Sequence, residues 1–338
     1  MKVLQEHLNK WMLLYVGLAI GLGLLVGYAG AAWTQTNSGW VSTMTTAAVF
    51  FVIYPMMINL KLESLVKAGK NLKGLSLAMI YNFIWTPLIG FVLAHFFLHD
   101  PLIALGFLLV MVVPCSSMAI GYTGLSGANV ELATVSVALS FIIAVFTVPF
   151  WMTIFASHYA VPVPVREMVT TILTVLIGPM ILGYFTRRGL VRWFGEATFK
   201  KVQPFFPSLS LLAMFGIIFL IFFGKAMMVM SKWQVVLLLV VPSALYVLLS
   251  LGLQTWLNRR LGLRYHDHMA VSFTSSSSNN STAIAIATLA FSPLVAVPAA
   301  TMPIIQTILM VSYLKLAPQV RAYFEQPRAA EADALPPD

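Results

Sequence analysis

The sequence predicts an all-α membrane protein with ten transmembrane helices in an inverted 5+5 repeat, and three observations lead to this prediction. The chain is 59% hydrophobic and only 9% charged, whereas soluble domains carry about 25% charged residues. Its apolar stretches are long enough for membrane-spanning helices, which need about 20 residues each. Basic residues gather in alternate segments between these stretches, as they do in proteins with a fixed membrane orientation.

Charged residues, glycines and prolines divide the apolar sequence into ten predicted helices. Residues 1–10 precede them as a polar segment that we expect to be cytoplasmic. Residues 11–318 are expected to form a single membrane domain, and the acidic, Pro-rich residues 319–338 a disordered cytoplasmic tail. The predicted helices lie near 11–33, 40–60, 72–97, 102–124, 130–157, 167–187, 205–224, 234–256, 268–290 and 296–316.

The distribution of lysine and arginine tests this count of helices. If the N-terminus is cytoplasmic, seventeen of the 20 basic residues fall in cytoplasmic segments, and only Arg166, Lys225 and Lys232 fall outside. A wrong count would have mixed the two sets, because positive charge marks the cytoplasmic side. The chain is therefore expected to be a multi-pass protein of the cell's inner (plasma) membrane with both termini cytoplasmic. The net charge of +9 is explained by these loops and predicts no nucleic-acid partner.

Ten helices divide into two sets of five, at 11–157 and 167–316. Because each set has an odd number of helices, the second enters the membrane with inverted orientation, which is a common construction of secondary transporters. Two faint sequence matches agree with the division. "LLVGY" ends at Tyr28 and "MILGY" ends at Tyr184, and Pro87 in the third helix corresponds to Pro242 in the eighth.

The fourth and ninth predicted helices, which correspond in the two repeats, both contain a polar interruption near their middle. The fourth carries "PCSSM" from Pro114, and the ninth carries "SSSSNNST" from Ser275 to Thr282. Proline removes a helical hydrogen bond, and Ser, Asn and Thr side chains compete for backbone groups. Irregular backbone at membrane depth is tolerated only inside the protein or beside a cavity. Both helices are therefore predicted to be broken and to form a site for an ion or small polar solute.

Three stretches resemble the bile acid/arsenite/riboflavin transporter superfamily: "IYPMMINLKLESL", "PCSSM" followed by "GAN", and "SSNNSTAIAIA". Within it, the arsenite-efflux permease branch, concerned with arsenical resistance, is the more similar. The resemblance implies a secondary active transporter with crossed, broken helices 4 and 9, in which helices 1, 2, 6 and 7 form a panel that moves for alternating access. It also implies arsenite or antimonite efflux, as by antiport, with an essential cysteine that corresponds to Cys115.

Cys115 suits arsenite because a soft thiolate selects soft, thiophilic ions, and one cysteine gives one labile bond that permits turnover. The favoured substrate is As(OH)3, held transiently, and we expect no resident cofactor. Asn59 and Lys61 are candidates for the cytoplasmic mouth. The candidate substrate ligands are Cys115, Ser116, Ser117, Asn279, Asn280 and Thr282.

The coupling ion, H+ or Na+, is left open because the carboxylates of the relatives are missing. Where the arsenite permeases place a glutamate this chain has Thr282, and where the bile-acid branch places one it has Ser275. Ala119 and Ile120 stand where that branch has sodium ligands in helix 4. The remaining candidates for coupling are Glu131, the only acid near the predicted core, and the oxygen-bearing Ser275, Ser277 and Ser278.

Two other interpretations stay open. One is a sodium- or proton-coupled symporter of a small organic anion, and the other is a receptor or scaffold that transports nothing. An enzyme is not expected, because the chain has no phosphate-binding loop, GxSxG or HExxH motif. The run of His266, Asp267 and His268 has no fourth ligand within reach in the sequence. It predicts that Asp267 caps the ninth helix, not that the run binds a metal.

Overall fold

The structure is a computed structural model that describes residues 4, 7, 8, 10–59, 71–161, 165–224, 226–231 and 233–326. Within these residues the regular elements are all helical, and a single isolated bridge pairs Cys115 with Ser278 in antiparallel fashion. The predicted all-α class is confirmed. The candidate Lys61 lies outside the described residues.

The first half of the chain follows the predicted ranges closely. Residues 72–97 form one continuous rod whose central turn, η2, is a π-helix. The Phe83 carbonyl in this turn accepts a hydrogen bond from Trp151 Nε1 at 2.9 Å. The helices are α2 (Met12–Ala29), α3 (Ala31–Thr36), α4 (Ser38–Ile58), α5 (Leu72–Ile80), η2 (Tyr81–Trp85), α6 (Thr86–Phe97), α7 (Pro101–Val112), α8 (Met118–Leu125) and α9 (Val130–His158).

The second half repeats this alternation of long and interrupted helices. Its elements are α10 (Val165–Ile172), η3 (Leu173–Ile177), α11 (Gly178–Val202), α12 (Phe205–Gly224), α13 (Ala226–Ser231), α14 (Trp233–Leu238), α15 (Val240–Arg260), α16 (Tyr265–Ser276), α17 (Asn280–Ile286), η4 (Ala287–Phe291), α18 (Ala296–Lys315) and α19 (Ala317–Glu325). Of these, η3 and η4 are π-helices.

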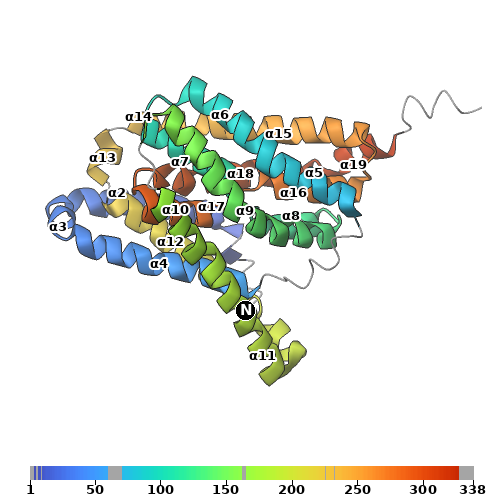
Figure 1. Ribbon diagram of the computed structural model, residues 1–338, viewed down its shortest axis with the longest axis horizontal. Coiled ribbons are helices and arrows are strands. Elements are labelled where there is room, and N and C mark those ends of the chain that lie inside the picture. The colour runs from blue at the N-terminus through green and yellow to red at the C-terminus, as the bar shows by residue number, and fades with distance from the viewer. Residues whose placement is uncertain are drawn as a thin grey trace, which may run out of the picture.

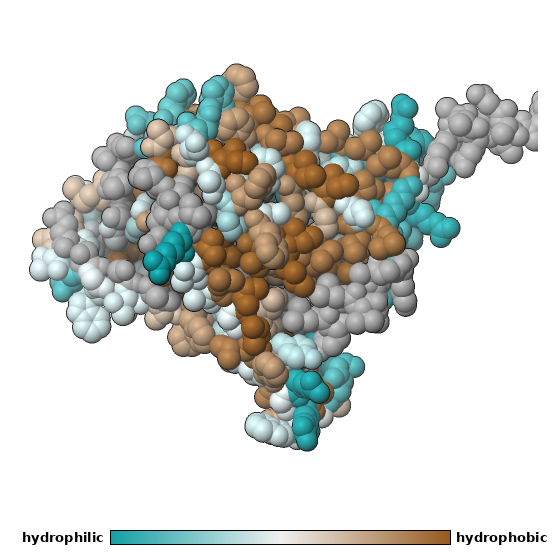
Figure 2. All heavy atoms as spheres, viewed as in Figure 1, coloured by the Kyte–Doolittle hydropathy of each residue, from teal (hydrophilic) through white to brown (hydrophobic). Residues whose placement is uncertain are grey.

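Six of the described helices are long and apolar enough to cross a membrane: 39–58, 72–97, 130–158, 205–224, 240–260 and 296–315. Shorter apolar helices cover Leu14–Ala29, Pro101–Val112 and Asn280–Phe291. Hydrophobic side chains form a broad band across the visible face, and hydrophilic ones lie mostly toward its ends (Figure 2). These are features of a multi-pass membrane protein. Helical residues occupy every predicted range, but the number of ten spans and the inverted repeat stay predictions.

Four helices, α2, α4, α11 and α12, pack against one another and are called the panel here. In α2, Gly23 and Gly27 allow close approach, because a Cβ at Gly27 would overlap the Phe223 carbonyl of α12. Tyr54 OH lies 2.8 Å from Thr186 Oγ1, which links α4 to α11. The other long helices, α5 to α9 and α15 to α18, pack into a second group, the core bundle. Figure 1 shows α2, α4 and α12 side by side and α5, α6 and α15 on the other side of the molecule.

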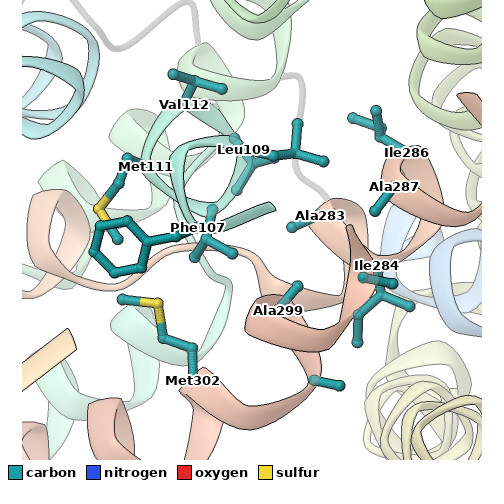
Figure 3. Packing of buried hydrophobic residues seen from close by; sticks show 14 of the residues in the cluster. Phe107, Leu109, Met111, Val112, Ala283, Ile284, Ile286, Ala287, Ala299 and Met302 are labelled. Atoms are coloured by element: carbon teal, nitrogen blue, oxygen red, sulfur yellow. The ribbon is translucent and has the colours of Figure 1, made fainter. Parts of the chain in front are cut away.

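The interrupted helices are fixed by apolar packing on one side of the break. Phe107 and Met111 of α7 are fully buried, as are Ala283 and Ile284 of α17. Their side chains lie close to those of α18, such as Met302 (Figure 3). The half-helices α7 and α17 therefore meet inside the core bundle, and their broken ends are directed at each other.

Three predicted boundaries differ from the structure. The sixth helix does not stop at 187, because α11 continues beyond it to a kink at Gly195, where the backbone is not helical (φ 78°), and a second helical segment then reaches Val202. Arginine, lysine and glutamate sustain a helix well. Part of the expected disordered tail is helical, since α19 reaches Glu325, and residues 327–338 lie outside the described part. The ninth helix begins earlier than expected, at Tyr265.

Asp267 is not the cap of the ninth helix. Arg264 occupies the N-cap position, with extended backbone and no side-chain cap. Asp267 lies in the first turn, where its Oδ1 accepts a hydrogen bond from Asn129 Nδ2 at 2.7 Å. The Asn129 N–H also donates to the His266 carbonyl, at 3.1 Å. The start of α16 is therefore fastened to the α8–α9 connection by contacts that the sequence alone could not assign.

Candidate functional site

The two helix breaks lie directly against each other. Ser116 N donates to the Ser277 carbonyl at 2.7 Å, and Asn279 N donates to the Pro114 carbonyl at 2.9 Å. Each break thus supplies partners for backbone groups that the other has lost from its helix. This satisfies the requirement that backbone polar groups away from water be hydrogen-bonded. Helix breakers placed in two separate helices therefore produce a single paired break in the interior.

Cys115 lies at the centre of the paired break and is fully buried. Its backbone N–H donates to Ser140 Oγ of α9 at 3.0 Å. Its Sγ accepts a hydrogen bond from Asn82 Nδ2 of the π-turn η2 at 3.3 Å. The sulfur is therefore held by a neutral amide donor, and the position of Asn82 depends on the π-turn that interrupts the third helix.

Ser116 and Ser117 have different environments from the cysteine. Ser116 Oγ accepts a hydrogen bond at 3.3 Å from the backbone N–H of Met118, the first residue of α8. Ser117 is exposed. Of the two serines, Ser116 lies at the paired break through its backbone, whereas the Ser117 side chain is not buried there.

Asn279 and Asn280 have separate roles at the start of α17. Asn279 Oδ1 accepts from Thr282 N at 3.1 Å and caps the helix. Its Nδ2 lies 3.5 Å from Met56 Sδ of α4, a contact between the core bundle and the panel. Asn280 Nδ2 donates to Gln306 Oε1 of α18 at 2.9 Å. The asparagines are thus fixed by their neighbours in three different helices.

Two oxygen atoms at this end of α17 have no hydrogen-bond partner among the described residues. They are Asn280 Oδ1 and Thr282 Oγ1, and both are buried. A buried polar atom without a partner costs about 1–3 kcal/mol. Such atoms are explained when a ligand satisfies them. Both atoms can accept hydrogen bonds, so they are available to a solute that carries hydroxyl groups.

The candidates for ion coupling are divided between two places. Ser277 and Ser278 are buried at the paired break itself. Ser275 lies before it, with its Oγ 3.1 Å from Gln254 Oε1. Glu131 is exposed in the first turn of α9. It precedes Ser140, the α9 residue that contacts Cys115, by roughly 13 Å along the helix axis. The structure therefore does not bring Glu131 to the break.

Asn59, the other candidate for the cytoplasmic mouth, lies at the C-cap of α4. Its Nδ2 donates to the Gln203 carbonyl at 3.2 Å, which links it to the end of α11. It therefore belongs to the panel and not to the paired break.

Sequence reasoning missed three amide side chains that support the breaks. Asn82 holds the Cys115 sulfur, Gln254 lies within hydrogen-bond distance of the hydroxyls of Ser275 and Ser276, and Gln306 donates to the Ser276 carbonyl at 3.0 Å. Each is a carboxamide side chain inside a largely apolar helix. That is a usable signal, because polar groups within a membrane are costly and are normally paired or functional.

Comparisons with known proteins agree on a family. The profile of the Sodium Bile acid symporter family matches residues 46–232, which is more than half of the 338 residues. The arsenical-resistance protein Acr3 of Alkaliphilus metalliredigens is 25% identical over 251 residues, covering 69% of this chain and 70% of the relative. Acr3 of Corynebacterium glutamicum is 25% identical over 300 residues, covering 83% and 80%.

A third relative has a different name. The uncharacterized sodium-dependent transporter YocS of Bacillus subtilis is 24% identical over 263 residues, covering 77% of this chain and 78% of the relative. Relatives of similar identity are thus named for arsenical resistance and for sodium dependence. Overall identity does not separate the two groups, so the chemistry of the site must decide between them.

Proposed function

Because the chain belongs to the sodium bile acid symporter family, we propose that it is a secondary active transporter that exports arsenite or antimonite, with Cys115 as the thiol ligand. The observation that carries the proposal is the position of Cys115 in the fold. The chain's one cysteine is buried where the two helix breaks meet, and its sulfur accepts a hydrogen bond from the Asn82 amide. The names of the two Acr3 relatives support the same substrate.

The proposed chemistry is a reversible exchange of ligands on arsenic. The Cys115 sulfur forms a bond to the arsenic of As(OH)3 while one As–O bond breaks, and the thiol proton leaves with that hydroxyl group as water. Hydrolysis reverses the step and releases As(OH)3. Soft sulfur ligands favour this thiophilic element, and a single S–As bond stays labile enough for release.

The neighbours of Cys115 suit a neutral solute with hydroxyl groups. The two unpartnered oxygens, Asn280 Oδ1 and Thr282 Oγ1, can accept hydrogen bonds from the remaining As–OH groups. The side chains assembled at the paired break are uncharged: Cys115, Asn82, Ser277, Ser278, Asn279 and Asn280. A strongly charged anion would lack a counter-charge among them, whereas As(OH)3 needs none.

Movement of the panel against the core bundle provides the proposed alternating access. The boundary passes beside the site, since Asn279 of the paired break contacts Met56 of α4. A shift of the panel would therefore change access to Cys115 without separating the two breaks. The uneven distribution of basic residues supports a plasma-membrane carrier with both termini cytoplasmic.

The test is As(III) uptake into everted membrane vesicles, with and without a proton or sodium gradient. We expect wild-type protein to accumulate As(III), and Cys115→Ser to fall to the level of vesicles without the protein, because a hydroxyl group is a poor ligand for this element. Ser117→Ala, at an exposed neighbour, is the matched control and should keep its transport. Undiminished transport by Cys115→Ser would remove the thiol mechanism.

A second candidate function is sodium- or proton-coupled symport of a small organic anion. It is favoured by the hydroxyls of Ser277 and Ser278, which are buried at the paired break and are oxygen ligands of the kind that sodium prefers. It is also favoured by the name of the Bacillus subtilis relative. The same vesicles decide: no As(III) movement, together with sodium-dependent movement of an organic acid, would replace the first proposal with this one.

A further inference from the structure

A seam of buried polar side chains runs along one face of α15, beginning beside the paired break and extending away from it. Its members are four residues apart and therefore share a helix face. None has any exposed surface. They are Tyr246, Ser250, Gln254 and Asn258. In a helix surrounded by apolar residues, such a continuous polar face must be satisfied by its neighbours.

The third and ninth helices provide the partners on the two sides of this seam. On the η2–α6 side, Thr86 lies 3.3 Å from Tyr246 OH, Trp85 donates to Ser250 at 3.1 Å, and Tyr81 donates to Asn258 at 2.9 Å. On the α16 side, the Ser275 carbonyl accepts from Tyr246 at 3.3 Å and Ser276 Oγ accepts from Gln254 at 3.2 Å. The seam thus leads from the paired break to the start of α16, where it ends at His268.

His268 is fully buried, and three polar groups lie within hydrogen-bond distance of its ring nitrogens. Asn258 Nδ2 lies 3.0 Å from His268 Nδ1, and Ser272 Oγ lies 3.3 Å from the same atom. With the Asn258 NH2 group in this place, which can only donate, Nδ1 accepts and carries no proton. The ring proton is therefore on Nε2, which donates to Tyr313 OH at 2.8 Å. Tyr313 continues the chain to Thr255 Oγ1, also at 2.8 Å. The imidazole is neutral in this arrangement.

The groups that face the imidazole are neutral as well. Tyr313 of α18 and Ser272 of α16 contact it directly, and Phe324 of α19 stacks on it with ring centroids 4.3 Å apart. Tyr81 of η2 is linked to it through Asn258. The charged side chains of the packed elements are exposed or bonded elsewhere. They are Lys73 (α5), Glu131 (α9), Arg259 and Arg260 (α15), Asp267 (α16), Lys315 (α18), and Arg321 and Glu325 (α19). The other titratable groups of these elements are Tyr122 (α8), Tyr246 (α15), Tyr265 and His266 (α16) and Tyr323 (α19).

We propose that His268 is the proton-binding site of this transporter and that its protonation is transmitted to Cys115. A proton added at Nδ1 would face the Asn258 NH2 group, so two donors would meet at the shorter of the two Nδ1 contacts, and only the Ser272 hydroxyl, at 3.3 Å, could accept. The conflict is relieved if the Asn258 amide turns over, which presents its oxygen to the imidazolium and its NH2 group to Tyr81 OH. The Tyr81 hydroxyl must then give up the bond that it donates now.

The transmission is short because Tyr81 and Asn82 are adjacent in the π-turn η2. A change at Tyr81 moves the turn that holds Asn82 against the Cys115 sulfur. Protonation of His268 therefore shifts the ligand site between two arrangements, one with Asn82 held against the Cys115 sulfur and one with Asn82 moved by the turn. For its coupling role this inference rests on the proposed transport function. His268 is thus a titratable group linked to the paired break, whose own side chains include no carboxylate.

The direct test follows the reactivity of Cys115 with pH, since it is the only thiol in the chain. Full-length protein in nanodiscs is treated with methyl methanethiosulfonate between about pH 5 and 9, the range in which histidine titrates. The His268→Gln variant cannot be protonated at this position. The plot of the Cys115 modification rate against pH should therefore contain one more inflection for the wild type than for this variant. Across that inflection the ratio of the wild-type rate to the variant rate should change about tenfold. The exposed neighbour variant, His266→Gln, should behave like wild type. Superimposable profiles for wild type and His268→Gln would overturn the proposal.

A second variant keeps the test valid if His268→Gln does not fold. Asn258→Asp places a carboxylate opposite Nδ1, which stabilises the imidazolium, and should move the inflection to higher pH. Nitrogen-15 NMR of histidine-labelled wild type should show one neutral Nε2–H imidazole that titrates in the same interval. An unmoved inflection, or an imidazole that never titrates, would contradict the proposal. These measurements need no substrate, so a failure of arsenite transport would leave them intact.

Coupling itself is tested in proteoliposomes. His268→Gln should lose accumulation driven by a pH gradient but keep exchange of As(III) across the membrane, because the Cys115 ligand remains. Accumulation equal to wild type would show that His268 does not carry the coupling proton. Absence of As(III) movement in wild type would instead count against the proposed function.

Discussion

At the scale of single residues, the reactivity of the site depends on what holds the Cys115 sulfur. A buried thiol without polar contacts would be an inert apolar group. Here the Asn82 amide donates to Sγ, while the Ser140 hydroxyl accepts from the Cys115 backbone N–H. In the proposed mechanism this donor stabilises negative charge on the sulfur and orients it for the bond to arsenic.

This arrangement makes a prediction for Asn82. Asn82→Leu preserves size but removes the donor, and a hydrogen bond to a charged or charge-developing group contributes about 1.5–3 kcal/mol. We therefore expect As(III) transport to fall at least about tenfold, measured as the initial rate in everted vesicles. Trp85→Phe removes a different donor from the same π-turn and is the control. Equal losses in both variants would show that only the fold of η2 had been disturbed.

Some of these residues could be predicted from the sequence, and others could not. Cys115 and Asn279 stand out because their residue types are unusual in the middle of an apolar span, next to a proline or a serine run. Asn82, Gln254 and Gln306 are equally unusual one at a time, but their partners lie on other helices. Which amide meets which break is decided by packing, and the sequence does not specify it.

At the scale of elements, the two breaks are the clearest success of pattern reasoning. Pro114 and the run from Ser275 to Thr282 predicted interruptions, and the structure places gaps between α7 and α8 and between α16 and α17. The π-turns were not predicted, because η2 contains no glycine or proline and its sequence "YNFIW" is compatible with an ordinary helix. Its inserted turn is supported by tertiary contacts such as that of Trp151.

The panel depends on close contact between α2 and α12, which gives a second prediction. Gly27→Val would place side-chain atoms where the Phe223 carbonyl lies, and such overpacking costs about 1–3 kcal/mol. We expect a lower midpoint of thermal unfolding in detergent and weaker transport. Gly21→Val, at a position on the same helix with no atom within 4 Å of an added Cβ, is the matched control. A Gly27→Val protein as stable as this control would contradict the described packing.

At the scale of the whole molecule, the boundary between the panel and the core bundle is where the proposed alternating-access movement would take place. The helices of each group pack mainly against one another, while Asn279 of the core bundle contacts Met56 of the panel beside the site. The family and the helical architecture could be predicted because hydropathy and a few motifs are enough for them. The count of ten spans and the inverted repeat stay predictions, since six of the helices that the structure describes satisfy the requirement of length and apolarity.

The central claim is that one thiol per molecule carries the substrate, and arsenic K-edge X-ray absorption of the purified, As(III)-loaded protein tests it most directly. With a single cysteine in the chain, the spectrum should show one sulfur neighbour and the remaining neighbours as oxygen. Cys115→Ser should show oxygen alone. A wild-type spectrum with only oxygen around arsenic, or with three sulfur neighbours drawn from several molecules, would contradict the account.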